Sequence, residues 1–157
     1  MIKEFIERKS VHDVEEGQTL QPKFDQNNLI PVITVDISNN EILMHGYMNQ
    51  EAFRLSMETK EAHYWSRSRK CIWKKGETSG LNQNIKEIKI DDDQDCVIFI
   101  VELGGLKASC HVGYRSCFYR KLTSEDNEYV DQLEFTEKHK VFNPKDVYGN
   151  TPNPTKL

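Results

Sequence analysis

Three carboxylates recur at every second position in one short segment of the chain. The segment reads Asp91-Asp92-Asp93-Gln94-Asp95, and on an extended backbone side chains two residues apart point to the same face. Asp91, Asp93 and Asp95 would then converge, and a divalent cation relieves the repulsion between adjacent anions. Ligand sets made of oxygen alone favour Mg²⁺ or Ca²⁺ over zinc. An acidic turn that is merely solvated explains this segment equally well.

A second group combines thiols with an imidazole. Cys110 and Cys117 stand seven residues apart, and His111 follows the first cysteine. Thiolate and imidazole are ligands that zinc favours, and a catalytic zinc lowers the pKa of its bound water to about 7. The spacing is not that of a zinc knuckle, and free cysteines are often simply buried. Two cysteines also leave a further ligand to find.

A third segment, residues 63–80, mixes aromatic rings, cations, hydroxyls and glycines. A nucleotide needs a ring to stack on and donors for its phosphate oxygens, and this segment offers both. Two other interpretations stay open. Its tryptophans can fill the core beside solvated lysines, or the segment can form a small patch that binds single-stranded RNA.

The composition of the chain limits the class of protein to which these groups can belong. At 157 residues the chain fits one domain, and 37% apolar and 29% charged residues are typical of a globular, water-soluble protein. The formal charge of −4 gives no global attraction to DNA or RNA. No stretch approaches the roughly 20 apolar residues of a membrane span, and the N-terminus lacks the pattern of a signal peptide. We therefore expect a cytoplasmic protein with reduced cysteines and without nucleic-acid or membrane partners.

Hydrophobic patterning predicts the elements that must position these groups. Asn49 is a suitable N-cap for a helix over 50–59, and Gly104-Gly105 predicts a tight hairpin that returns through 108–112. Strands are expected over 29–37, 42–47 and 63–68, around 88–90, and over 96–103. The fold class that follows is α+β, predominantly antiparallel β with one or two short helices. We divide the chain into a domain over 1–122, with an irregular N-terminal arm over 1–28, and a polar, loosely packed tail over 123–157.

Five motifs in this order and spacing make the sequence specific. They are GYMNQEA (46–52), EAHYWSRSR (61–69), WKKGETSG (73–80), DDDQD (91–95) and CHVGYRSCFYR (110–120). Together they strongly resemble the phosphoribosyl-AMP cyclohydrolases, over about residues 13 to 121. The resemblance implies the third step of histidine biosynthesis, in which water opens the adenine ring of phosphoribosyl-AMP at its N1–C6 bond to give the formimino-carboxamide ribotide. It also implies an intertwined homodimer with its active sites at the subunit interface.

The resemblance assigns metals to both clusters. Asp91, Asp93 and Asp95 match the family's Mg²⁺ ligands, and Cys110 and Cys117 match two of its zinc ligands. The family's third zinc ligand is a cysteine between the first two aspartates, supplied by the other subunit, and here Asp92 occupies that position. A carboxylate can bind zinc directly, Cys96 is a second candidate, and weaker zinc binding, another metal or lost activity is the third possibility.

The chemistry requires a water aimed at C6 and a proton transfer as the ring opens. Our hypothesis is that zinc on Cys110, Cys117 and Asp92 generates hydroxide, with His111 as general acid or base and His63 as a less favoured alternative. A purely structural role for His111 stays open, as does a divergent paralogue that hydrolyses another purine-like amidine or uses a different metal. The candidate substrate contacts are Trp65, Arg67, Trp73, Lys75, Thr78, Ser79, Arg115 and Ser116.

Overall fold

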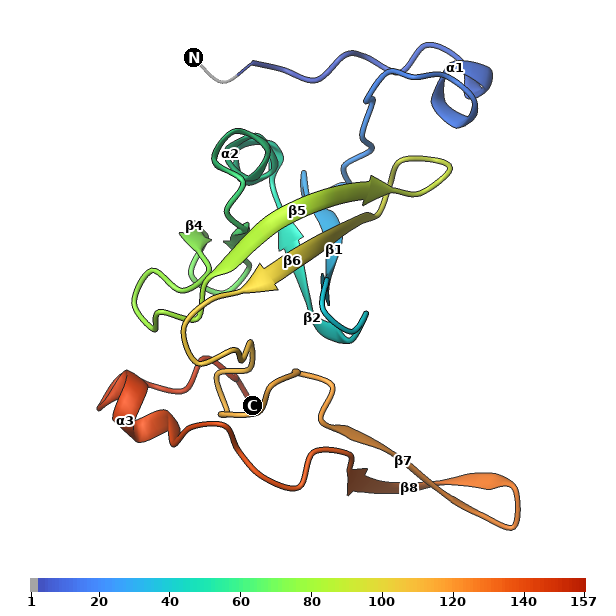
Figure 1. Cartoon of the computed structure of the whole chain (residues 1–157). Coiled ribbons are helices and arrows are strands. Elements are labelled where there is room, and N and C mark those ends of the chain that lie inside the picture. The colour runs from blue at the N-terminus through green and yellow to red at the C-terminus, as the bar shows by residue number, and fades with distance from the viewer. Residues whose placement is uncertain (1–2) are drawn as a thin grey trace.

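A four-stranded sheet forms the centre of the molecule (Figure 1). The structure, a computed structural model, describes residues 3–157. The sheet contains β1 (Ile30–Asp36), β2 (Ile42–Met48), β5 (Gln83–Ile90) and β6 (Val97–Leu103), in the order β2-β1-β6-β5. The pairs β1–β2 and β5–β6 are antiparallel, whereas the central pair β1–β6 is parallel. The acidic segment lies in the connection between β5 and β6.

Alternation of side chains explains why the central strands hold the core. Every second residue of β1 and of β6 is buried, as expected when one face of a strand packs against a core. Helix α2 (Gln50–Thr59) supplies Phe53 to this core, and the Asn49 side chain accepts a hydrogen bond from the Ala52 amide at its first turn. Phe5 of the N-terminal arm packs on Phe53, so part of the arm is fixed to the domain.

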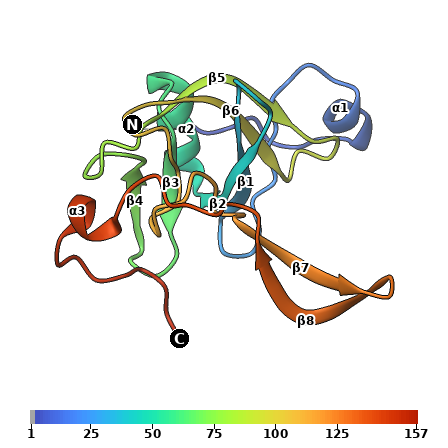
Figure 2. The ribbon, with the colours of Figure 1, turned by 60° about the horizontal axis from the view of Figure 1, so that its bottom comes forward.

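Two small antiparallel hairpins flank the sheet. Strands β3 (His63–Ser66) and β4 (Cys71–Lys74) pair with each other, and Tyr64 of β3 is wholly inside the core. Strands β7 (Arg120–Glu125) and β8 (Glu128–Phe135) form a second hairpin that stands away from the body (Figure 2). Two five-residue helices, α1 (Val11–Glu15) and α3 (Pro144–Tyr148), lie near the two ends of the chain. Among the described residues, no helix combines the length and apolar character needed to span a bilayer.

The α+β class with mostly antiparallel strands is confirmed, with three short helices in the described part of the chain. The helix over 50–59 and its cap are confirmed as well. The expected return strand over 108–112 is wrong: Gly104 and Gly105 lead into a loop, because the next residues fold around Cys110 instead of pairing with β6. The tail over 123–157 contains most of the β7–β8 hairpin and α3, which its polar composition did not indicate.

Candidate active site

The three aspartates of the acidic segment come together at one end of the β5–β6 hairpin. One carboxylate oxygen from each of Asp91, Asp93 and Asp95 lies within 4.8 Å of the others. A turn produces this convergence, since Asp91 accepts hydrogen bonds of 2.9 Å from the amides of Asp95 and Cys96. Partial desolvation and repulsion by Asp93 and Asp91 raise the pKa of Asp95. This oxygen-only donor set suits Mg²⁺ or Ca²⁺. Asp92 stays outside the trio and is exposed.

Gln94 ties this acidic loop to the N-terminal arm. Its side-chain oxygen accepts a 2.6 Å hydrogen bond from the Gln21 amide, and its nitrogen donates to the carbonyls of Val14 and Thr19 at 2.9 and 3.3 Å. Arg8 adds a 2.8 Å bond to the Asp93 carbonyl. The arm therefore helps to set the backbone path of the loop that carries the three carboxylates.

Cys110 and Cys117 also come together, in the loop after β6. Cys110 is buried and Cys117 is exposed, and interaction between the two thiols shifts the pKa of both. This interaction, helped by backbone amides and the Lys75 ammonium, lowers the pKa of Cys110 to about 6. The same interaction, together with partial desolvation of the sulfur atom and the charge on Cys110, raises the pKa of Cys117. A bound zinc ion would favour the deprotonated form of both thiols.

A chain of buried polar side chains leads from the sheet to this cysteine loop. The Tyr64 hydroxyl lies 2.6 Å from the Thr34 hydroxyl and donates to the Gln83 side chain, also at 2.6 Å. The Gln83 amide then donates to the Ser109 hydroxyl at 3.1 Å, directly before Cys110. Buried polar groups that satisfy one another define a single arrangement, so the core fixes where the loop begins.

Lys75 and His111 complete the surroundings of the cysteines. The Lys75 ammonium is buried and donates a 2.6 Å hydrogen bond to the Ser109 carbonyl. Burial and the charge of Lys75 lower the pKa of His111, while a hydrogen bond with the Asn153 side chain opposes them. The His111 Nε2 atom is buried and has no hydrogen-bond partner among the described residues. The cysteine loop therefore presents two sulfurs and one uncommitted imidazole nitrogen, next to the buried cation of Lys75.

The remaining candidate residues occupy several different places. Arg115 pairs with Asp36 and Glu41, and the Ser116 hydroxyl donates to the Ile42 carbonyl at 2.7 Å, so both are engaged in holding the cysteine loop against β1 and β2. Trp73 packs beside Tyr64 at the edge of the core. The others are partly buried or exposed and lie on β3, its turn, or the glycine-containing loop: His63, Trp65, Arg67, Thr78 and Ser79.

The C-terminal tail returns to the cysteine loop, which the sequence did not predict. The Val141 amide donates to the Gly113 carbonyl at 2.8 Å. A side chain at Gly113, whose φ is +105°, would collide with the Phe142 carbonyl oxygen. Burial and the nearby charges of both cysteines raise the pKa of Tyr148 of α3, and the Ser79 side chain opposes this shift. These contacts join residues far apart in sequence, and no local spacing pattern could have indicated them.

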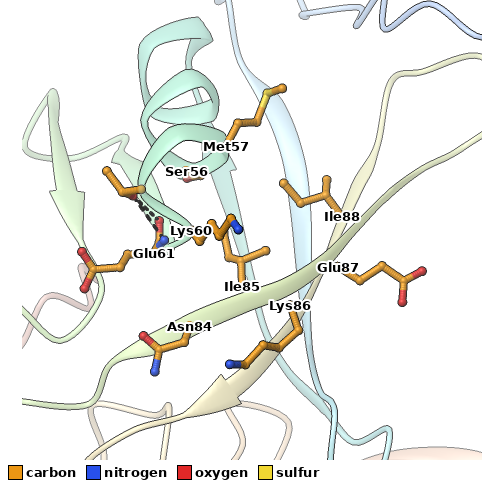
Figure 3. Close-up of a pocket in the computed structure, with 10 residues that line it drawn as sticks. Ser56, Met57, Lys60, Glu61, Asn84, Ile85, Lys86, Glu87 and Ile88 are labelled. Carbon is orange, nitrogen blue, oxygen red and sulfur yellow. Dashed lines mark hydrogen bonds between the residues drawn. The ribbon is translucent and has the colours of Figure 1, made fainter.

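Surface hollows lie beside the helix α2 and beside the acidic loop. The larger, of about 610 Å³, runs between α2 and β5 and contains none of the candidate residues (Figure 3). The smaller, of about 410 Å³, lies between the N-terminal arm and the acidic loop and is lined by Asp91, Asp92 and Gln94. The donor groups of the cysteine loop and of the acidic loop, and not these hollows, identify the candidate site.

Comparison with known proteins gives one consistent result. The family model of phosphoribosyl-AMP cyclohydrolase matches residues 44–119. A phosphoribosyl-AMP cyclohydrolase of Bradyrhizobium diazoefficiens is 44% identical over 137 residues, which cover 87% of this chain and 95% of that protein. The phosphoribosyl-AMP cyclohydrolase of Rhizobium leguminosarum bv. trifolii is 46% identical over 136 residues, which cover 87% of this chain and 89% of that protein. That of Brucella canis is 51% identical over 111 residues, which cover 71% of this chain and 80% of that protein. The chain belongs to the phosphoribosyl-AMP cyclohydrolase family.

Proposed function

We propose that this protein hydrolyses the N1–C6 bond of phosphoribosyl-AMP, the third step of histidine biosynthesis. The observation that carries the proposal is the pairing of Cys110 and Cys117 beside an uncommitted His111, in a chain 44–51% identical to proteins of that name. Substitution at N1 makes the adenine ring cationic, so C6 becomes the electrophile and an activated water is the required nucleophile.

A zinc ion fits the cysteine pair, because thiolates are its favoured ligands and the lowered pKa of Cys110 favours the thiolate form. When bound, zinc would supply the acidity that turns a water into hydroxide. His111 is lowered in pKa and neutral near pH 7, so its free Nε2 can take up a proton and return it as the N1–C6 bond breaks. Lys75 balances the negative charge of the thiolates from the buried side.

The third zinc ligand has to come from elsewhere, and chain geometry supports a second subunit. Asp92 precedes β6 and Cys110 follows it, so the seven-residue strand separates them. An extended strand of that length spans roughly 20 Å, and the two loops lie at opposite ends of the β5–β6 pair (Figure 1). Asp92 of one chain cannot reach Cys110 of the same chain without unfolding β6. We infer a homodimer in which the partner supplies this ligand, and Cys96 lies at the same far end.

Exposed apolar side chains on the β7–β8 hairpin agree with a dimer. Leu122 and Leu133 face each other across the hairpin and are 49% and 48% exposed, and Phe135 is 56% exposed. Apolar groups gathered on a projecting hairpin are typical of surfaces that another chain covers.

At the other proposed metal site, Mg²⁺ on Asp91, Asp93 and Asp95 would hold substrate phosphate or fix the loop. The free thiols agree with a cytoplasmic enzyme.

The test is turnover of phosphoribosyl-AMP by protein that is stripped of metal and then given Zn²⁺, Mg²⁺ or Mn²⁺, singly and together. We expect activity that needs zinc and magnesium, from a dimer by light scattering. Asp92 is the observation that favours the alternative, a divergent enzyme with another metal or another purine-like amidine. Activity with Mn²⁺ alone would favour the different metal. A folded dimer that turns over phosphoribosyl-AMP under no condition would refute the proposed reaction.

A further inference from the structure

The carboxylate of Glu137, in the C-terminal tail, accepts hydrogen bonds from the backbone of the cysteine loop. Glu137 accepts a 2.8 Å hydrogen bond from the Arg115 amide on one oxygen and a 2.8 Å bond from the Ser116 amide on the other. These two amides directly precede Cys117. Hydrogen bonds from amides to an ionised carboxylate are about twice as strong as those between neutral groups, so Glu137 is a firm anchor for this stretch of backbone.

The rest of the loop is held from the opposite side. The Cys117 amide donates to the Leu43 carbonyl of β2 at 2.7 Å, and Lys75 holds the Ser109 carbonyl at 2.6 Å. Glu137 is the partner of the two backbone amides of residues 115–116, whose side chains contact β1 and β2. Removing its carboxylate would leave the two amides next to Cys117 without partners, and the position of Cys117 relative to Cys110 would then be defined less tightly.

The hairpin delivers Glu137 to this position. Strand β8 ends at Phe135, the Thr136 amide donates to the Tyr119 carbonyl at 2.9 Å, and Tyr119 stacks on Tyr114 with 4.0 Å between ring centroids. Phe135 packs on both tyrosines. Glu137 forms no ion pair within the described chain, so both oxygens stay available for the two amides. Side-chain attraction to Lys or Arg does not explain its placement.

We propose that Glu137 is a positioning residue of the metal site: its carboxylate fixes the place of Cys117 relative to Cys110, so that the pair can share one zinc ion. The inference rests on the proposed zinc site and extends it to the C-terminal tail, outside the matched segment 44–119. Groups that orient metal ligands without touching the metal typically change metal affinity about 10–100-fold when removed. Glu137→Ala should therefore lower zinc affinity by at least about 10-fold.

The experiment measures zinc affinity of the metal-stripped full chain by competition with a chromophoric chelator. Glu137→Ala is compared with Glu137→Gln, which keeps one acceptor oxygen but turns an NH₂ group toward the other amide, and which should lie between Ala and wild type. The matched control is Glu134→Gln, in the same hairpin, where Glu134 pairs with Lys121 on the surface at 2.9 Å. That control should bind zinc like wild type. Mg²⁺ affinity should be unchanged in all three variants, because the acidic loop lies at the other end of β6.

Circular dichroism and melting temperature identify variants that fail to fold. If Glu137→Ala fails to fold, the zinc affinity of Glu137→Gln tests the inference instead. Folded Glu137 variants with wild-type zinc affinity would overturn the inference and leave the proposed reaction intact. A parallel loss of zinc and Mg²⁺ affinity would also overturn it, since it would indicate general disruption. If wild-type protein binds no zinc, the inference fails together with the zinc part of the proposed function, and turnover by the wild type then decides the reaction separately.

Discussion

Replacing Gln94 by alanine would test whether the N-terminal arm is a structural part of the acidic loop. Gln94 is only 5% exposed and makes three side-chain hydrogen bonds to the backbone of residues 14–21. Its own carbonyl accepts a further 2.8 Å bond from the Lys23 amide, which alanine would retain. The substitution therefore removes one defined set of contacts between two segments more than seventy residues apart.

Each lost hydrogen bond contributes about 1 kcal/mol net, and a buried amide left without a partner costs about 1–3 kcal/mol. The Gln21 amide and the Val14 carbonyl lose their partners together, so we expect a loss of about 3 kcal/mol in the free energy of unfolding. With a urea slope of about 2 kcal/mol per molar, the midpoint should fall by about 1.5 M. The Mg²⁺ affinity should fall as well, because the loop loses its support.

Glycine at position 94 separates the loss of the side-chain hydrogen bonds from the cost of the backbone conformation. Gln94 has a φ of +58°, in the left-handed region, where a side chain costs about 1 kcal/mol relative to glycine. Gln94→Gly loses the same hydrogen bonds as Gln94→Ala but relieves this strain. It should therefore be about 1 kcal/mol more stable than the alanine variant.

The assay is urea unfolding followed by circular dichroism at one fixed protein concentration, since the stability of a dimer depends on concentration. Gln132→Ala, on the exposed face of β8, is the control and should change stability by less than about 0.5 kcal/mol. If Gln94→Ala unfolds within about 0.5 kcal/mol of wild type, the arm does not hold the loop. Equal stabilities of the alanine and glycine variants would refute the argument from backbone conformation.

Four further predictions follow from the two metal sites and their supports. Cys117→Ala should abolish zinc binding and turnover while the far-ultraviolet spectrum and dimer mass stay unchanged. Asp93→Asn should weaken Mg²⁺ binding at least about 10-fold in calorimetry, with zinc affinity unaltered. Asp92→Cys should raise zinc affinity and lower the relative preference for Mn²⁺, which competition among the metals would measure. Although burial opposes the shift, hydrogen bonds from Ser38 and Arg115 hold the pKa of Asp36 below its usual 3.8. The contribution of Asp36 to the free energy of unfolding is therefore complete above pH 3.8 and is lost as the pH falls through the lower pKa of the folded state. Asp36→Asn should accordingly make the free energy of unfolding fall less steeply in acid, as urea unfolding over a pH series would measure.

Local patterns predicted those parts of the fold that depend on local forces. Segments rich in β-branched and apolar residues located β1 and β6, and Asn49 located the start of α2, because strand preference and capping are properties of adjacent residues. The parallel β1–β6 pair depends on which strands meet after the chain crosses over, and local composition carries no information about that choice. The β7–β8 hairpin escaped prediction because its side chains are mostly exposed, so it lacks the apolar alternation of a half-buried strand.

The donor groups of the site were predictable, whereas their supports were not. Asp91, Asp93 and Asp95 lie close together along the chain, as do Cys110 and Cys117, so spacing made convergence one of the open interpretations, and the family resemblance then assigned a metal to each set. The groups that hold them are distant and chemically unremarkable. Their backbone contacts arise only when the tertiary structure brings the segments together. Lys75 illustrates the difference: its sequence context suggested a phosphate contact, but burial places its ammonium against the Ser109 carbonyl and beside the thiols.

Both sets of proposed metal ligands lie in loops that contact segments outside the part of the chain that the family model matches. The N-terminal arm binds the acidic loop through Arg8 and through the backbone of residues 14–21, and the C-terminal tail binds the cysteine loop through Glu137. The matched segment 44–119 contains the proposed ligands but not these partners. Metal affinity depends on holding ligands at fixed separations as much as on their chemistry. If metal binds at the two proposed sites, changes confined to the two ends of this chain should therefore tune its affinity while every ligand stays the same.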